Sequence, residues 1–445
     1  MTRHSSAMFP NERGAILIQV AVAMLGLLAF SAFSIDYGIL WMSRRQAQNS
    51  ADAGALAGAI ALAFDDPTDF SDTGAAKQSA HAAVLVNRVF GVAPDNNVST
   101  DITFYGPSLA AQCPDGDTAA TCVRVDVHRT VARGNPLPTF FARLSGVMSQ
   151  DISATATAKV TSGTNVSCMR PFAILAKWDE FDASHELPHD YDVAPNHLDP
   201  DYIPIDSSFD KYPFSGMHTP VEPDYYVPAV NCAPGDTACT PVPGTGFRPF
   251  TEDGQTPVDY GRQVEIHTGA QDQNSAGWFA PVRLHPGQSG ASDYCDVIKQ
   301  CDPSQTNGIG ETISTENGNM VGPTDHCLFS DPDSLFNRDP TAHWVPANTD
   351  PNWPNGAVLS DDYPPNQSPR IVPLPVIDPD EFFASDPNGH TTLVIRNILG
   401  FFIEDQIGHG GHTVTRGRLI NVPSDDIGGS TTSTSSFLRK IILIR

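Results

Sequence analysis

The chain has 445 residues, of which 40% are hydrophobic, 9% aromatic and 17% charged. This length suggests two or three folded units, and the apolar fraction is too high for a wholly disordered chain. The 51 acidic residues against 26 basic ones give a net charge of −25, which argues against nucleic acid or an anionic membrane surface as a partner. The 38 prolines and 35 glycines favour turns and short strands over a helical bundle.

The negative charge is concentrated in the last two thirds of the chain. Residues 163–445 hold 38 of the 51 acidic and 15 of the 26 basic residues, which is −23 of the −25. The composition changes near residues 161–164, so we predict a domain boundary there. We interpret the acidity as a solvated surface of Asp-Pro loops, with cation binding as the alternative.

Residues 15–35 form an uncharged stretch of 21 residues. At about 1.5 Å rise per residue, a helix of this length extends roughly 31 Å and crosses a hydrocarbon core of about 30 Å. A cleaved signal peptide with Arg3 and Arg13 as its positive region is the alternative, but its apolar core would be about 7–15 residues long. We therefore predict an uncleaved transmembrane helix at residues 15–35 behind a short cytoplasmic leader at residues 1–14.

The flanking charges leave the direction of insertion open, because two arginines precede the span and two follow it. The cysteines decide the matter, since all of them follow the span and their number is even, as expected for disulfides formed in an oxidising compartment. They are Cys113, Cys122, Cys168, Cys232, Cys239, Cys295, Cys301 and Cys327. We therefore expect the C-terminal region to lie outside the cytoplasm.

Three neighbouring pairs of cysteines enclose short loops that contain Pro, Gly or Asp. These loops predict the disulfides Cys113–Cys122, Cys232–Cys239 and Cys295–Cys301 and, by elimination, Cys168–Cys327. Zinc binding is the alternative interpretation, but the sequence has no CxxC and no histidine at ligand spacing beside these pairs.

The helical pattern continues beyond the apolar span, without proline until Pro67. Tyr37 and Trp41 lie where an aromatic belt would meet lipid headgroups. Small residues then recur at intervals of three and four, which lets another backbone approach closely. They are Ala47, Ala51, Gly54, Ala55, Gly58, Ala59 and Ala63. We expect this face to pack on the chain's own following sheet, with lateral packing against copies or partner subunits as the alternative.

Residues 12–63 contain an ordered set of short motifs: Arg13-Gly14, the apolar span, Asp36-Tyr37-Gly38, Arg44-Arg45-Gln46, Gln48-Asn49 and the run from Ala51-Asp52 to Ala57. This set resembles the N-terminal module of Flp pilus-assembly TadG-like proteins, which TadE-type pseudopilins share. Weaker similarity extends through residues 138–146 and 151–160, and segments 168–178, 318–324 and 368–404 are similar to the C-terminal region of some TadG-like proteins. The resemblance implies a part in the tight-adherence pilus machinery of the bacterial envelope.

Two departures from these families limit the comparison. Pilin-like leaders are cut after Gly with Glu five residues further on, but the fifth residue after Gly14 is Gln19, which argues against cleavage there. Many TadG proteins carry a von Willebrand type A metal site of the form Asp-x-Ser-x-Ser. The nearest match, Asp151-Ile-Ser153-Ala-Thr155, lies in an alternating strand, so we reject it as a metal site.

The remaining sequence predicts an α+β fold. Residues 74–90 read as a second helix, and residues 99–106, 122–132 and 151–161 alternate as strands, with a short helix near Phe140 and Leu144. These elements form a small antiparallel sheet and complete a pilin-like module at residues 36–162. Residues 163–445 read as an acidic, β-rich, disulfide-stapled extracytoplasmic domain with long loops. Its strand candidates are residues 259–269, 277–284, 370–377, 391–404, 415–422 and 438–445, the last expected to pair within this domain's sheet.

The sequence contains no recognisable catalytic or nucleotide-binding motif. His409 and His412 could offer two imidazoles to a metal, although glycine-spaced histidines are more often incidental. Three groups of carboxylates could share a calcium ion, but none matches an EF-hand loop. They are Asp199 with Asp201, Asp331 with Asp333, and Asp378 with Asp380 and Glu381. We therefore expect no catalytic residue and no cofactor, with a structural calcium ion as the open alternative.

These observations predict a non-enzymatic, single-pass protein of the bacterial cytoplasmic (inner) membrane that supports Flp pilus assembly or adhesion. Its expected partners are the lipid bilayer and pilus-assembly or other envelope subunits. The alternative is a membrane-tethered periplasmic hydrolase or glycan-binding ectodomain, which would need a cleft with converging carboxylates and aromatic residues. Candidate aromatic residues for such a cleft are Trp278, Trp344 and Trp353.

Overall fold

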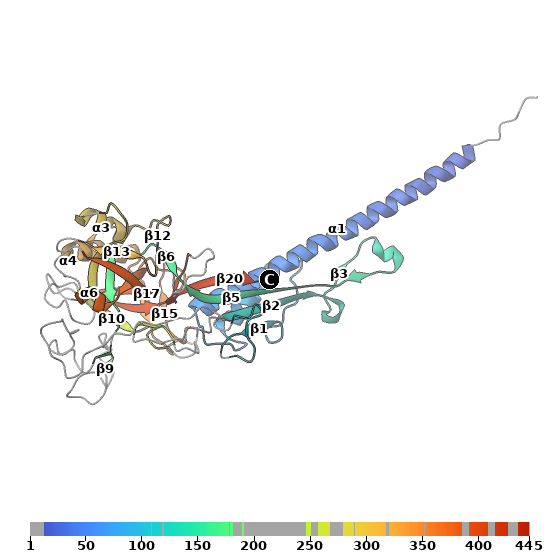
Figure 1. The fold of residues 1–445 in the computed structure, drawn as a ribbon. Coiled ribbons are helices and arrows are strands. Elements are labelled where there is room, and N and C mark those ends of the chain that lie inside the picture. The colour runs from blue at the N-terminus through green and yellow to red at the C-terminus, as the bar shows by residue number, and fades with distance from the viewer. Residues whose placement is uncertain are drawn as a thin grey trace, which may run out of the picture.

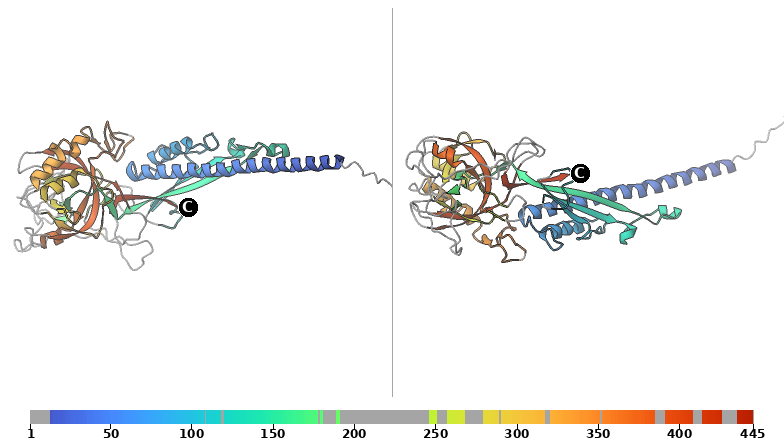
Figure 2. Two further views of the ribbon diagram at one scale, coloured as in Figure 1. Left: turned by 90° about the horizontal axis from the view of Figure 1, so that it is seen from above. Right: turned by 60° about the horizontal axis from the view of Figure 1, so that its bottom comes forward.

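A long N-terminal helix carries a small sheet along its second half and a β-rich head at its far end (Figures 1 and 2). We refer to the second half of this helix, together with the small sheet and the elements packed on it, as the stem. The computed structural model describes residues 13–107, 109–117, 120–177, 179–180, 189–190, 246–250, 257–267, 279–288, 290–316, 320–350, 352–384, 391–407, 414–425 and 435–444.

Helix α1 (Arg13–Phe64) is a single helix of 52 residues, which confirms the predicted continuation beyond the apolar span. It is rich in Ala and Leu, has no internal proline, and ends just before Pro67. At about 1.5 Å per residue it is roughly 78 Å long. Its N-terminal part projects away from the rest of the molecule in Figure 1.

The stem sheet lies against the second half of α1. Helix α2 (Ala75–Val86) and strands β1 (Ile102–Tyr105), β2 (Thr121–Arg129) and β5 (Ile152–Gly163) occur where the sequence predicts them. The strands pair as antiparallel neighbours in the order β1-β2-β5. Their buried face is made of alternating residues such as Val123, Val125 and Val127, which pack with the small residues of α1 and α2.

Two strands from the end of the chain complete this sheet. β20 (Ser435–Ile444) pairs antiparallel with β5, with Ile441 opposite Val160, and β19 (Val422–Pro423) pairs parallel with β20. The sheet order is therefore β1-β2-β5-β20-β19. We expected the last strand in the sheet of the acidic region. It joins the stem sheet instead, so the stem is assembled from both ends of the chain.

A hairpin extends from the stem sheet along α1 toward the N-terminus (Figure 1). Short strands β3 (Leu137–Pro138) and β4 (Ser149–Gln150) pair at its base, and the 3₁₀ helix η2 (Ala142–Ser145) forms its end, where the sequence predicts a short helix. Another 3₁₀ turn, η1 (Val131–Arg133), precedes it. We call residues 139–148 the hairpin tip.

The head is built on a ring of five strands. β17 pairs with β13 on one side and with β16 on another, while β11 and β7 join β13 to β16 and so close the ring. β18 and β10 extend the sheet from β17. The bounds are β7 (Phe172–Leu175), β10 (Gln263–His267), β11 (Phe279–Arg283), β13 (Thr312–Thr315), β16 (Ile371–Ile377), β17 (Thr392–Ile407) and β18 (Val414–Ile420). Except for β7 and β13, these strands lie within or beside the predicted ranges.

Short elements surround this ring. The helical ones are α3 (Gly290–Lys299), α4 (Val321–Asp325), η3 (His326–Ser330), α5 (Leu335–Arg338) and α6 (Pro379–Ala384). The paired short strands are β6 (Asn165–Ser167) with β12 (Thr306–Gly308), β8 (Asp179–Glu180) with β9 (His189–Asp190), and β14 (His343–Val345) with β15 (Ala357–Leu359). The fold is thus α+β, as predicted.

The disulfides agree with the prediction in one case and correct it in two. Cys113 pairs with Cys122 across the predicted short loop. The predicted pairs Cys295–Cys301 and Cys168–Cys327 are wrong, because the structure joins Cys168 to Cys301 and Cys295 to Cys327. The segment that contains Cys295 is helix α3 rather than a loop, and Cys301 follows the end of that helix, so the two thiols meet different partners. Cys232 and Cys239 lie outside the described residues.

Candidate functional site

The small-residue face of α1 is buried within the stem. Ala47, Ala51, Ala55, Ala59 and Ala63 are each at most 2% exposed and pack with α2, β2 and β5. Of the two interpretations of this face, the structure therefore shows packing on the chain's own following elements.

Gly54 and Gly58 stand where α2 and the sheet come closest to α1. A Cβ atom added at Gly54 would lie 2.6 Å from Val84 Cγ2, and one at Gly58 would lie 2.9 Å from Val123 Cγ1. The absence of a side chain at these two positions allows the close approach.

Polar residues beside this face tie α1 to its neighbours. Gln48 donates to the Asp52 carboxylate at 2.8 Å and to the Thr155 carbonyl of β5 at 3.0 Å. Gln46 accepts the Phe90 N–H at 2.7 Å in the loop after α2. The family-motif residue Asp52 thus positions a glutamine that bonds to the sheet.

Asp36, the family-motif residue just beyond the apolar span, holds the hairpin tip. Its two carboxylate oxygens accept the backbone N–H groups of Phe140 and Phe141 at 3.0 Å and of Ala142 at 2.6 Å. These donors form the start of η2, where backbone N–H groups have no partner inside the helix. The carboxylate therefore caps this turn and fixes the tip against α1. Of the other two motif residues, Arg13 begins α1 and Gly14 follows it.

The hairpin tip exposes apolar side chains. Phe140, Phe141, Leu144, Val147 and Met148 are between 40% and 89% exposed, with Leu144 the highest. Between the tip and α1 lies a groove of about 400 Å³. Its α1 side is lined by Ala29, Ala32, Phe33, Asp36, Tyr37, Ile39 and Leu40.

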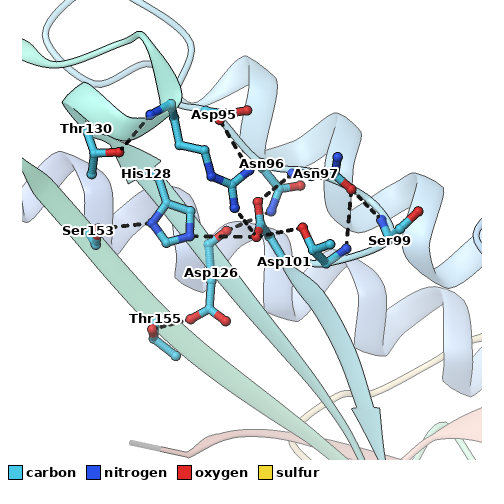
Figure 3. Close-up of polar contacts among 12 residues, drawn as sticks. Asp95, Asn96, Asn97, Ser99, Asp101, Asp126, His128, Thr130, Ser153 and Thr155 are labelled. Atoms are coloured by element: carbon cyan, nitrogen blue, oxygen red, sulfur yellow. Dashed lines mark hydrogen bonds and ion pairs between the residues drawn. The ribbon is translucent and has the colours of Figure 1, made fainter.

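A polar cluster at the base of the hairpin fixes its direction (Figure 3). Buried Asp101 accepts hydrogen bonds from the Asn97 N–H at 2.7 Å and from Arg133 Nη2 at 2.8 Å, and His128 Nε2 lies 3.8 Å away. Burial opposes the ionisation of Asp101, but these donors, together with the Thr100 hydroxyl, hold its pKa below the ordinary value. The ionised carboxylate joins the loop before β1 to β2 and η1.

The residues of the rejected Asp-x-Ser-x-Ser match are engaged separately. Asp151 accepts the Val131 N–H, Ser153 bonds to His128, and Thr155 donates to Asp126. Figure 3 shows the last two contacts between neighbouring strands. These partners leave the three side chains apart, and within the described residues no three His, Cys, Asp or Glu side chains gather as a metal site.

Three asparagines of the head bind the C-terminal end of α1. Asn366 donates to the Phe64 carbonyl at 3.0 Å and Asn421 donates to the Ala63 carbonyl at 3.2 Å. Asn355 donates to the Asp66 carboxylate at 2.7 Å. The last carbonyls of a helix lack partners within the helix, so Asn366 and Asn421 cap α1, and all three asparagines attach the head to this end of the helix.

The carboxylate groups considered for calcium form ion pairs where the structure describes them. Asp331 lies 2.9 Å from Lys299 Nζ and accepts the Asp333 N–H. Glu381 lies 3.0 Å and Asp378 lies 3.8 Å from Arg396. A basic side chain is therefore already beside each group. The pair Asp199 and Asp201 and the histidines His409 and His412 lie outside the described residues.

Trp344, one of the tryptophans considered for a binding cleft, is a packing residue. Its ring lies 6.1 Å from that of Tyr260 and 5.5 Å from the Arg418 guanidinium carbon. A Cβ atom added at Gly261 would lie 2.7 Å from the Trp344 ring, which shows how closely the backbone covers it. Trp353 is half-buried, and Trp278 lies outside the described residues.

The stem is thus an α+β module built on one long N-terminal helix, and two family models match it. The Tad model, for Flp pilus-assembly TadE/G-like proteins, matches residues 14–61, and the Tad_C model, for Tad-like Flp pilus-assembly proteins, matches residues 57–158. The chain is therefore similar to TadE/G-like Flp pilus-assembly proteins over residues 14–158, as the sequence resemblance indicated, and these residues hold α1 and most of the stem. No curated protein and no solved structure matches the chain significantly.

Sequence reasoning identified Asp36 but missed the hairpin tip that it holds. It predicted that the small-residue face packs on the following sheet, but it did not predict the part that α2 has in this packing. The exposed apolar residues of the tip follow one another closely in the sequence, and such a cluster between two short strands could have indicated a surface of interest. The asparagines that cap α1 are single polar residues in loops, and nothing in the sequence distinguishes them.

Proposed function

We propose that this protein is a single-pass, non-enzymatic component of Flp pilus assembly or adhesion. In this proposal α1 anchors the chain in the cytoplasmic membrane through residues 15–35, and the stem and head lie outside the cytoplasm. Its partners are the lipid bilayer and pilus or other envelope subunits.

The observation that carries the proposal is the change in exposure along one continuous helix. The large apolar side chains from Ile16 to Phe33 are exposed by at least 52%, whereas Ala47, Ala51, Ala55, Ala59 and Ala63 are buried. A described helix of this length and hydropathy can cross a membrane, and the exposed apolar surface then faces lipid. The buried half supports the folded stem beyond the bilayer.

The disulfides support an extracytoplasmic location for the stem and head. Three of them are described, one in the stem and two in the head, and such bonds persist in oxidising compartments. The non-enzymatic role is supported by the family matches and by Asp331, Glu381 and Trp344, each of which has a structural partner.

Anchoring is tested by carbonate extraction of membranes that contain the full chain. We expect the wild type to stay in the membrane fraction and Leu25→Arg, in the middle of the apolar span, to weaken that retention. Ile60→Arg is the matched control, because Ile60 is also exposed on α1 but lies in the stem. Extraction of the wild type would reject the anchor.

Topology is tested by fusing alkaline phosphatase, which is active only outside the cytoplasm, after residue 445. We expect an active fusion, and an inactive fusion with all cysteines reduced would contradict the proposal.

The pilus role is tested by deleting the gene in the source bacterium and counting surface Flp filaments and attached cells. Wild-type counts of both after deletion would exclude a supporting role.

A further inference from the structure

We infer that the hairpin tip, residues 139–148, inserts into the extracytoplasmic leaflet of the membrane that α1 crosses. The inference rests on the proposed anchor and adds a second, independent contact with the same lipid surface. The tip and α1 would then fix the tilt of the stem relative to the membrane.

The first observation is the composition and exposure of the tip. Leu144 is 89% exposed, Met148 65% and Phe140 52%, and Phe141 and Val147 are each at least 40% exposed. Five large apolar residues within nine positions exceed the scattered exposure that a soluble surface shows. Residues 139–148 include no acidic side chain, although the chain as a whole carries a net charge of −25.

The second observation is the level of the tip along α1. The groove between them is lined by Leu144 and Phe141 on one side and by Ala29, Ala32 and Phe33 on the other. Ala29 lies six residues before Ile35, the end of the apolar span, which corresponds to roughly 9 Å along the helix. This distance matches the depth of about 5–10 Å at which interfacial elements bury their apolar faces. The tip and the lipid-facing part of the helix therefore line one largely apolar groove.

The third observation is that most backbone N–H groups of the tip have an acceptor in the protein, which lowers the cost of entry into lipid. Asp36 accepts the N–H groups of residues 140, 141 and 142. The N–H groups of residues 139, 144, 146 and 147 donate to carbonyls within the hairpin. Arg143 is the one charged residue of the tip, and its long stem allows the guanidinium to reach the headgroups.

The test measures contact between tip and lipid in the full-length protein, reconstituted in phosphatidylcholine vesicles with brominated acyl chains. Leu144→Trp places a fluorophore at the exposed end of the tip, and the wild-type emission is subtracted. Val86→Trp is the matched control, because Val86 is 80% exposed but lies far from the apolar span. Its position along α1 is given by the nearby Val84, whose carbonyl accepts a hydrogen bond from the hydroxyl of Ser50. That level is roughly 20 Å beyond the end of the apolar span. Both sites are on the surface, so neither variant should disturb the fold.

We expect bromolipid to quench the added emission of Leu144→Trp at least twofold more than that of Val86→Trp, and acrylamide to show the reverse order. Equal, weak quenching by lipid in a chain that resists carbonate extraction would overturn the insertion and leave the anchor intact. Protection of Leu144→Trp from both quenchers would also overturn it, because a protein partner would then cover the tip. Extraction of the chain by carbonate would reject the anchor and the insertion together.

Discussion

The carboxylate of Asp36 accepts a hydrogen bond of 2.6 Å from the backbone N–H of Ala142, which lies 106 positions further along the chain. One ionised side chain at the end of the apolar span thus determines where the hairpin tip rests. Hydrogen bonds to charged groups are stronger than neutral ones, so this contact explains how a short hairpin with little buried surface keeps a defined position.

Replacing Asp36 by Ala should release the hairpin tip from α1. The three N–H groups of residues 140–142 would lose their acceptor, so trypsin should cleave after Arg143 several-fold faster than in the wild type. Asp36→Asn, which keeps one acceptor oxygen, should fall between the two. The measurement is the rate of cleavage at this bond under native conditions, followed by mass spectrometry.

Asp52→Ala is the control for Asp36→Ala, since Asp52 is a carboxylate on the same helix that bonds to Gln48 and not to the tip. Equal cleavage rates in the wild type and in Asp36→Ala would show that the carboxylate does not hold the tip.

Replacing Gly54 or Gly58 by Ala should destabilise the stem. The new Cβ atoms would lie 2.6 Å from Val84 Cγ2 and 2.9 Å from Val123 Cγ1, and overpacking of this kind costs about 1–3 kcal/mol. We expect a lower melting temperature for both variants, measured by circular dichroism in detergent. The double variant Gly54→Ala, Val84→Ala should recover part of the loss.

Gly38→Ala is the matched control on the same helix. A Cβ atom there would have no neighbour within 4 Å, and alanine is the better helix former by roughly 0.5–1 kcal/mol. Its melting temperature should stay the same or rise. A loss equal to that of Gly54→Ala would contradict close packing as the cause.

The elements that the sequence revealed are those defined by local periodicity. The run of small residues at α1, the alternation in β2 and β5, and the apolar strands β16 to β18 each appear within one continuous segment, so their types and approximate bounds were predictable. The row of Ala and Gly on α1 also predicted close packing on the chain's own following sheet, with packing against copies or partner subunits as the alternative, but it did not predict the contact with α2.

The features that could not be predicted from the sequence depend on contacts between distant segments. β20 has the pattern of a buried strand, but whether it pairs in the head or with β5 depends on where the chain returns. Asp36 and Ala142 are linked by geometry that no local pattern records. Helix α3 was not predicted, because it has only ten residues and begins at Gly290, three positions after Gly287. The segment from Cys295 to Cys301 was therefore interpreted as a short loop, which gave the wrong disulfides.

Peptide mapping without reduction should find Cys168 linked to Cys301 and Cys295 linked to Cys327. Trypsin cleaves after Lys299, and Glu-C cleaves after Glu311 or Glu316, so these four cysteines fall on separate peptides. Removing the link between Cys295 and Cys327 should cost about 2–4 kcal/mol of stability. A peptide linking Cys295 to Cys301 would contradict the structure.

The single variant Cys295→Ser gives an independent check of the same pairing. This variant should leave Cys327 as the reactive thiol, which is detected by maleimide labelling of the unreduced protein after mild denaturation. Cys301→Ser should instead expose Cys168. Labelling of Cys301 in the first variant would support the pairing of sequence neighbours.

Asp65, at the junction of α1 with the head, should make stability depend on pH. Burial, with the nearby charge of Asp66, raises its pKa to about 6. Because this value lies above that of the unfolded chain, about 3.9, the folded protein binds the proton more tightly. The contribution of Asp65 to the free energy of unfolding is therefore greatest below about pH 4, falls as the pH rises toward 6, and stays low above pH 6.

Replacing Asp65 by Asn removes the buried charge, so the variant should be more stable than the wild type at pH 8, by on the order of 1–3 kcal/mol. At pH 4 the two proteins should melt at nearly the same temperature, because the wild-type carboxyl is then protonated. Thermal unfolding at both pH values measures the difference. Asp362→Asn, at an exposed position of the head, controls for the loss of one negative charge. An equal gain for Asp65→Asn at pH 4 and pH 8 would show that ionisation of this carboxyl does not limit the stability of the junction.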